Sequence, residues 1–217
     1  MIFRAFLLCV LTPLLASAGG PPTDVELLRQ SLASFSRAKV MRLSVEKRTE
    51  SILLEKTETS AGEIHLKKDR FRWETSEPVK SLILFDGKNL WTMQENPEAL
   101  GGGKQVTKSV MTKTSKDQIL FRLIAGQVRI VEDFLVTRLK TNEGEAVFEL
   151  KPKKEDPSVK DFILTIETGK PRLKSVEFKD EIGNVTTLIF GRPENVKKPA
   201  KDLFQFRVPK GIEVITL

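Results

Sequence analysis

The sequence predicts a mainly β protein with an α-helical lid: an incomplete antiparallel β-barrel (half-barrel) covered by short helices. Three observations lead to this fold class. Apolar and polar residues alternate with a period of two along much of the chain after residue 40. Turn residues such as Asp-Gly and Gly-Asn separate the alternating runs. Helical spacing of apolar residues is confined to two short stretches, residues 24–37 and 116–125, which are the available covers.

The first helical stretch follows a Pro-Pro spacer. Thr23 or Asp24 can cap its N-terminus, and Glu26 places an acidic residue in the first turn. Apolar residues recur at spacings of three and four along it: Val25, Leu28, Leu32 and Phe35. The pattern therefore predicts an amphipathic helix over residues 24–37.

The strands are expected in two groups, about seven before the second helical stretch and about five after it. The first group comprises the runs at 41–46, 52–54, 63–67, 71–73, 81–85, 88–93 and 104–110. The second comprises 134–139, 146–150, 161–167, 172–178 and 184–190, and a final run at 204–208 leads into an apolar tail. Asp86-Gly87, between two apolar runs, is the strongest turn signal and predicts a hairpin over residues 81–93.

The N-terminus has the pattern of an export signal. Arg4 precedes an apolar run, and Ala16-Ser17-Ala18 provides an A-x-A cleavage site. Cys9, the only cysteine, lies inside the apolar run after three large residues, so we expect it to be removed rather than lipidated. We therefore expect a signal peptide at 1–18 and a single domain at 19–217, without a thiol or a disulfide.

The charge pattern leaves two interpretations of one stretch. The formal net charge is +7, which suits an anionic partner, but acidic and basic residues interleave almost throughout. Residues 67–73 read KKDRFRW, which fits a single-stranded nucleic-acid platform or a half-buried strand. Because Phe71 and Trp73 share one face of a strand and export removes most nucleic-acid partners, we favour the strand and expect no nucleic acid.

Catalytic and metal-binding patterns are scarce in the sequence. His65 is the only histidine, so a histidine-based triad or a multi-histidine zinc site cannot be assembled. The sequence has no phosphate-binding loop and no nucleophile elbow. The adjacent acids Glu132-Asp133 and Asp180-Glu181 are expected in turns. We predict a protein that is not an enzyme and uses neither a metal nor a cofactor.

The interior of the half-barrel is the remaining candidate for function. Each strand offers one row of large apolar side chains, and this row must be buried by something. The helices and side chains can fill the interior completely as a plain core, or the interior can be a cavity for an apolar ligand. The residues alone leave both alternatives open.

A resemblance to a known family bears on this choice. Residues 62–91 read GEIHLKKDRFRWETSEPVKSLILFDGKNLW, and the later segments ILFRLIAG, VFELKPK, DFILTIE, LKSVEFKDEIGNVTTLIF and FQFRVPKGIEVI follow in order. In these segments the chain resembles the LolA family of periplasmic lipoprotein carriers. The resemblance implies an open half-barrel whose hydrophobic concave face is closed by a helical lid. The chain ends soon after Val214, so the extra C-terminal strand of some members is expected to be missing.

The resemblance also implies a function. A protein of this family is a periplasmic chaperone that binds lipoprotein acyl chains. It receives its cargo from an inner-membrane lipoprotein-releasing ABC transporter and delivers it to an outer-membrane lipoprotein acceptor. We expect a monomer in the periplasm, exported by a cleaved signal peptide. The alternatives are an anchored outer-membrane acceptor and an envelope-stress sensor with the same half-barrel.

The resemblance further implies three sets of site residues. The wall of the acyl-chain cavity is expected to comprise Met41, Leu43, Val45, Ile64, Leu66, Phe71, Trp73, Leu82, Leu84 and Trp91. The lid is expected to contribute Ile119, Leu120, Leu123 and Ile124. A basic residue that holds the lid closed corresponds best to Lys68, with Arg70 as the alternative. If the strand continues through Asp69, Arg70 points away from the cavity, which favours Lys68.

Overall fold

The computed structural model describes residues 22–36, 39–96, 98, 101–110, 120, 123–124, 128–153 and 161–217. The helical elements are α1 (Asp24–Ala33), a 3-10 turn η1 (Ser34–Ser36) and α3 (Ile130–Asp133). The strands before the lid region are β1 (Met41–Ser51), β2 (Lys56–Lys67), β3 (Arg70–Glu77), β4 (Ser81–Phe85), β5 (Asn89–Glu95) and β6 (Lys104–Val110). The later strands are β7 (Phe134–Asn142), β8 (Glu145–Pro152), β9 (Phe162–Glu167), β10 (Arg172–Lys179), β11 (Val185–Phe190), β12 (Glu194–Asn195) and β13 (Val214–Thr216).

The strands of the described residues form one 13-stranded sheet. Its order is β13-β6-β5-β4-β3-β2-β1-β11-β10-β9-β8-β7, with β12 paired to β1. All neighbours pair antiparallel except β13, which runs parallel to β6. The order ends at β13 and β7, which do not pair with each other, so the sheet is open. The fold class predicted from the sequence, a half-barrel with few helices, is confirmed.

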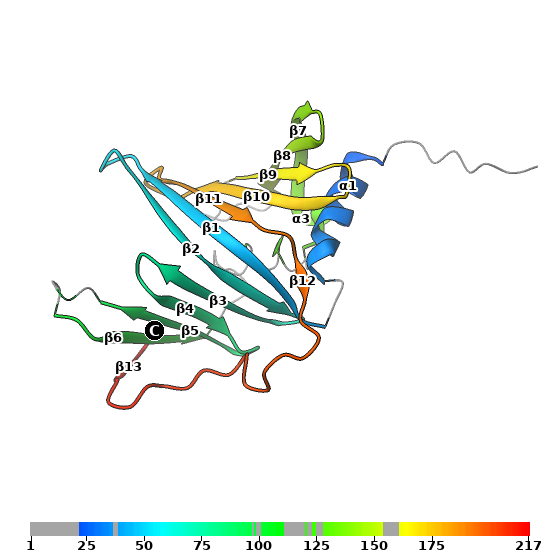
Figure 1. Ribbon diagram of the computed structural model, residues 1–217. Coiled ribbons are helices and arrows are strands. Elements are labelled where there is room, and N and C mark those ends of the chain that lie inside the picture. The colour runs from blue at the N-terminus through cyan, green and yellow to red at the C-terminus, as the bar shows by residue number, and fades with distance from the viewer. Residues whose placement is uncertain are drawn as a thin grey trace, which may run out of the picture.

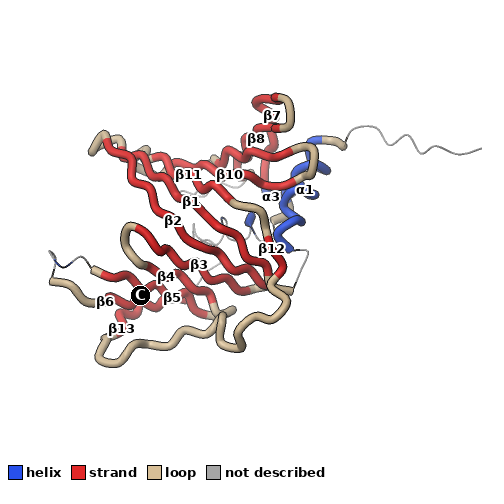
Figure 2. Tube along the Cα trace, viewed as in Figure 1, coloured by secondary structure: helices blue, strands red, loops and turns tan. Residues whose placement is uncertain are grey.

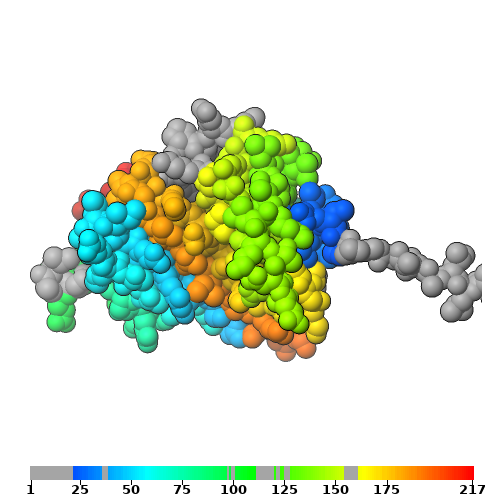
Figure 3. Space-filling model, turned by 90° about the horizontal axis from the view of Figure 1, so that it is seen from above, coloured from blue at the N-terminus to red at the C-terminus, as the bar shows by residue number. Residues whose placement is uncertain are grey.

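The sheet bends around the long hairpin of β1 and β2. Figure 1 shows β3–β6 on one side of this hairpin and β7–β11 on the other. In Figure 3, which looks down on the molecule, the β1–β2 hairpin (cyan), β10 and β11 (orange) and β7 and β8 (green) lie side by side, with α1 (blue) at one end. The tube in Figure 2 shows that the helices occupy a small part of the molecule. The bend gives the sheet a concave face and a convex face.

Helix α1 begins as the sequence predicts. Thr23 is its N-cap, and its hydroxyl accepts a hydrogen bond of 3.3 Å from the backbone N–H of Glu26. The helix packs against β9 and β10 and buries Leu27, Leu28 and Leu32. Asp24 forms an ion pair with Arg138 of β7, which joins the start of α1 to the edge of the sheet.

The main core lies between the concave face and the helical segments. Its buried residues come from α1, β1, β2 and β3, from β8–β11, and from residues 120, 123 and 124. Phe148, Leu164 and Val176, on three neighbouring strands, are each 0% exposed. One continuous apolar face therefore extends across both sides of the β1–β2 hairpin.

Three expectations about individual strands were wrong. Residues 52–54 form the turn between β1 and β2, where all three side chains are exposed, rather than a strand. Residues 204–208 are not a strand but part of an irregular segment over the convex face. Val214–Thr216 does form a C-terminal strand, β13, although its absence was expected.

Candidate functional site

The register of the strands shows which side chains line the concave face. In an antiparallel pair, residues directly opposite each other point to the same side of the sheet. Two rows cross β1 to β5. One row contains Met41, Leu66, Phe71, Phe85 and Leu90, and the other Leu43, Ile64, Trp73, Ile83 and Thr92. The first row is entirely apolar, and the second becomes polar only at its far end.

Seven of the predicted cavity residues lie on this face. They are Met41, Leu43, Val45, Ile64, Leu66, Phe71 and Trp73, and all belong to the buried core. Trp73 is the most exposed of them, at 9%. The structure thus brings these seven side chains together, and their role in binding a ligand stays a prediction.

The other three predicted cavity residues, Leu82, Leu84 and Trp91, point to the opposite side, and their expected placement is corrected. Leu84 pairs with Arg72 and with Trp91, so Leu84 and Trp91 lie on the same side as Arg72, which is the convex face. Leu82 pairs with Glu74 and shares that side. The residues of β4 and β5 that do pack against the main core are Ile83, Phe85 and Leu90, which the sequence reasoning missed.

The convex face of β3–β6 has its own cover. Residues 196–213, here called the C-terminal segment, run across it (Figure 1). The ring of Phe206 stacks on Trp91 with centroids 4.8 Å apart, and Arg72 donates a hydrogen bond of 3.4 Å to the carbonyl oxygen of Leu203. A cavity of about 420 Å³ remains between the segment and the sheet, lined in part by Leu82. Leu82, Leu84 and Trp91 therefore serve this second core.

Asp86 fixes the orientation of Trp91. Its carboxylate accepts hydrogen bonds from the indole N–H of Trp91 at 2.9 Å and from the backbone N–H groups of Lys88 at 2.9 Å and Asn89 at 2.8 Å. Partial burial raises the pKa of Asp86, but these hydrogen bonds to the ionised form outweigh it, and the pKa lies below its ordinary value. The Asp-Gly turn thus also holds an aromatic side chain on the convex face.

The predicted lid lies largely outside the described residues. Ile119 is among the residues not described, and so is most of the stretch 116–125. Leu120, Leu123 and Ile124 are described, are at most 7% exposed and belong to the same core as the concave face. Three of the four predicted lid residues therefore lie against the predicted cavity wall.

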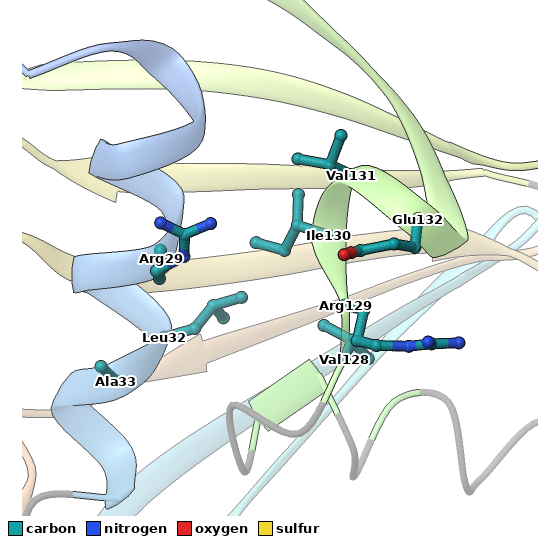
Figure 4. A pocket seen from close by; sticks show the side chains of 8 residues that line it. All are labelled: Arg29, Leu32, Ala33, Val128, Arg129, Ile130, Val131 and Glu132. Atoms are coloured by element: carbon teal, nitrogen blue, oxygen red, sulfur yellow. The ribbon is translucent and has the colours of Figure 1, made fainter.

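A pocket of about 330 Å³ opens between α1 and the segment 128–132 (Figure 4). Leu32 of α1 and Ile130 of α3 line it and also belong to the main core. Arg29, Arg129 and Glu132 lie at its rim. Because two of its lining residues are core residues, this pocket reaches the edge of the apolar interior at the point where α1 meets α3.

The two candidates for the basic lid contact lie in different places. Lys68 and Asp69 form the two-residue turn between β2 and β3, and Asp69 has a φ of 59°. The strand is therefore interrupted at Asp69, contrary to the condition attached to the prediction. Arg70 nevertheless pairs with Lys67 and lies on the convex side, since its neighbour Phe71 is concave. The position of Arg70 on the convex side still favours Lys68, and its contact with a lid stays a prediction.

His65 lies in β2 on the convex face, opposite Arg42 and Arg72. Partial burial lowers its pKa, an effect that Glu63 and Glu74 oppose, and its Nδ1 has no hydrogen-bond partner in the described part of the protein. Within the same part, no group of three His, Cys, Asp or Glu side chains could hold a metal ion. His65 faces away from the concave face and thus from the candidate site.

Comparison with known proteins identifies the family. The family model described as "Outer membrane lipoprotein carrier protein LolA" matches residues 45–207, which is more than half of the chain. The chain belongs to the LolA family. This LolA match extends from the middle of β1 to the C-terminal segment, so it includes most of the strands that form the concave and convex faces.

Individual proteins similar to this LolA family member were also found. An outer-membrane lipoprotein carrier protein of Legionella pneumophila (strain Corby) is 30% identical over 158 residues, covering 72% of this chain and 73% of that protein. One of Azotobacter vinelandii is 28% identical over 220 residues, covering 99% and 98%.

A solved structure supports the fold of this LolA family member. An uncharacterized conserved protein of Thermus thermophilus has a TM-score of 0.51 at 16% identity, covering 88% of this chain and 98% of that chain. At this identity the likeness concerns the fold alone. No helix in the described part of the chain is long and apolar enough to cross a membrane.

Proposed function

We propose that the protein is a periplasmic lipoprotein carrier that holds acyl chains against the concave face and takes its cargo from the inner to the outer membrane. The observation that carries this proposal is the continuous apolar concave face, which is covered by separate helical segments rather than by a second sheet. Membership of the LolA family supports it. The relatives from Legionella and Azotobacter, both named outer-membrane lipoprotein carrier proteins, support it as well.

The energetics of acyl-chain burial explain why such a face needs a cover. Burying a chain of about sixteen carbons yields roughly 12 kcal/mol at about 0.8 kcal/mol per methylene. Several fully buried chains would exceed the affinities that allow release. Here Leu120, Leu123 and Ile124 already occupy the face. Because cargo must displace these side chains, apolar contacts are exchanged rather than newly gained, which keeps the net affinity low enough for transfer.

Lys68 is proposed as the residue that holds the lid closed. It lies in the turn between β2 and β3, directly beyond the concave residue Leu66, and its side chain is exposed. A lysine donates as a point charge, without the fork of an arginine. Replacing it, as in Lys68→Ala, is expected to increase the rate at which an apolar fluorescent probe enters the concave face. Arg70→Ala, on the convex side, is the matched control.

Export and hand-over complete the proposal. We infer that residues 1–18 are removed, so that a single monomeric domain begins at Gly19. We further propose that the inner-membrane ABC transporter supplies the lipoprotein and an outer-membrane acceptor receives it, with this chain acting by binding and not by catalysis. Mass spectrometry of the purified protein tests the first step: an N-terminus at Gly19 supports a soluble carrier, and a diacylated Cys9 would instead indicate an anchored acceptor.

Site-specific crosslinking tests the binding face. A photo-crosslinking amino acid is placed at Ile83, which packs against the main core, or at Trp91, which lies opposite on the convex face. Both positions are on neighbouring strands, so they differ mainly in the side they face. In periplasmic extract, the probe at position 83 is expected to capture lipoproteins, and the probe at position 91 is not.

Two results would contradict the carrier function. Equal capture of lipoprotein from positions 83 and 91 would show that the concave face is not the binding face. Failure of the purified protein to bind both lipoprotein and an apolar fluorescent probe would remove the carrier function altogether. In that case a signalling role of the same half-barrel becomes the better hypothesis.

A further inference from the structure

Another pocket, on the side away from the concave face, is lined by several cations. It has a volume of about 180 Å³ and lies between the beginning of β1, the β2–β3 hairpin and the C-terminal segment. Lys39, Lys67, Arg70 and Lys201 line it, and no acidic residue of the described chain does. Figure 1 shows these three parts of the chain converging at one end of the molecule.

The four cations have no acidic partner in the described residues. No ion pair and no side-chain hydrogen bond joins any of them to a carboxylate there. Of the nearby acids, Asp202 pairs with Arg207 at 3.2 Å, and the carboxylate of Asp86 accepts its hydrogen bonds within its own turn. Asp69, next to Arg70 in the β2–β3 turn, does not line the pocket. The four cations that line the pocket therefore outnumber the acids beside it that are not engaged elsewhere.

The floor and walls of the pocket are well defined. Val40 is 2% exposed and Phe204 6% exposed, and both line the pocket. The backbone N–H of Val196 donates to the carbonyl oxygen of Val40 at 3.0 Å, which fixes the C-terminal segment against the beginning of β1. A turn in which Leu203 N–H donates to Ala200 at 3.2 Å shapes the other wall. Like-charged side chains are thus gathered around a buried apolar base.

We propose that this pocket binds the phosphate group of an anionic phospholipid at a membrane surface. Arginine and lysine are the side chains that recognise phosphate. A membrane is favoured over a free phosphate because two further exposed lysines, Lys197 and Lys198, directly precede the lining residue Pro199 in the chain. An isolated phosphate would engage only the pocket, whereas an anionic bilayer would interact with the whole basic surface.

This inference goes beyond the proposed function and does not rest on it. The pocket is formed by residues on the convex side, and no concave residue lines it. Its consequence is an orientation: the end of the molecule where β1 begins would face the membrane. Cargo binding and membrane binding are then separate properties that can be lost separately.

Vesicle co-sedimentation of the purified, processed protein tests the proposal. The vesicles contain phosphatidylglycerol mixed with phosphatidylcholine, and pure phosphatidylcholine vesicles are the lipid control. The pocket variant combines Lys67→Gln, Arg70→Gln and Lys201→Gln. The matched variant combines Lys140→Gln, Lys170→Gln and Lys210→Gln, which remove the same charge from exposed positions outside the pocket.

At physiological salt, the unaltered protein is expected to bind the anionic vesicles. The affinity for these vesicles should fall about tenfold in the pocket variant and about twofold or less in the matched variant. Inorganic phosphate is expected to compete with the vesicles for the unaltered protein, which tests the pocket without any substitution. Equal losses in the two variants would overturn the proposal, because binding would then depend on net charge alone. Phosphate binding that needs the pocket cations, without vesicle binding, would also overturn it.

Discussion

The two faces of strands β3–β6 are both apolar, yet they are covered in different ways. On the convex face, directional contacts hold the C-terminal segment: Arg72 donates to the carbonyl oxygen of Leu203, and Trp91 stacks on Phe206. On the concave face, the described residues of the predicted lid, among them Leu123, contribute apolar side chains. Hydrophobic burial is non-directional, whereas a hydrogen bond requires one geometry. Together with the proposed carrier function, the comparison leads us to propose a permanent cover on the convex face and an exchangeable cover on the concave face.

The largest effect is expected for a substitution at Gly62, where β2 and β3 approach closely. The assignment of residues to the two faces depends on the pairing register of these strands. The pairing of β2 with β3 shifts register between Ala61 and Gly62, so Gly62 begins the regular part of the ladder. A Cβ atom at Gly62 would lie 2.0 Å from the backbone carbonyl oxygen of Glu74, which cannot move without disturbing β3. Gly62→Ala is therefore expected to lower the free energy of unfolding by about 3 kcal/mol or more, measured by urea denaturation.

Gly169→Ala is the matched control for this substitution. Gly169 has open space around its Cβ position and no positive φ, so the free energy of unfolding should change by less than about 1 kcal/mol. If the two variants were equally stable, the close approach of Gly62 to the backbone of Glu74 would not be needed for the pairing of β2 with β3.

The sequence predicted the β1–β3 part of the site but not the β4–β5 part, for a physical reason. In β1, Leu43 alternates with charged or polar neighbours because the convex side is solvated there, so the pattern identifies the concave side. In β4, SLILF is apolar at consecutive positions because both sides are covered. Periodicity cannot then show which side faces the cavity, and only pairing with β3 can.

A pair of leucines is expected to separate stability from binding. Leu43 on the concave face is 1% exposed and Leu84 on the convex face 0%. Either substitution by Ala is expected to lower the free energy of unfolding by about 2–5 kcal/mol, because each leaves a cavity. Only Leu43→Ala should also change the affinity for an apolar fluorescent probe, measured by titration. A change of similar size in Leu84→Ala would show that the probe also binds under the C-terminal segment.

A smaller effect is expected for the aromatic contact that fastens the C-terminal segment. Trp91 and Phe206 stack with an angle of 12° between their ring planes. In a double-mutant cycle of Trp91→Ala and Phe206→Ala, the coupling is expected to be about 0.5–1.5 kcal/mol in the free energy of unfolding. Strictly additive effects would mean that the segment is held by other contacts. Probe binding to the concave face should be unchanged in all three variants.

The smallest expected effect concerns His65, which the convex row places between Arg42 and Arg72. In the folded protein, burial lowers the pKa of His65 below its ordinary value of 6.5. Glu63 and Glu74 oppose this shift, and the two arginines add to it. The unfolded chain therefore binds a proton at a higher pH than the folded protein does. Stability should fall as the pH drops below 6.5, until the folded protein also becomes protonated.

His65→Gln tests this pH dependence because glutamine cannot titrate. The melting temperature of the variant should depend less on pH between about 6.5 and 5.5 than that of the unaltered protein, since most carboxylates titrate at lower pH. Identical pH profiles would mean that the pKa of His65 is the same in the folded and the unfolded protein, contrary to the effect expected from its burial. Because His65 lies on the convex side, probe binding to the concave face should be the same for both proteins across this range. A shift in probe binding that follows the titration of His65 would instead couple the two faces and break the distinction between a permanent and an exchangeable cover.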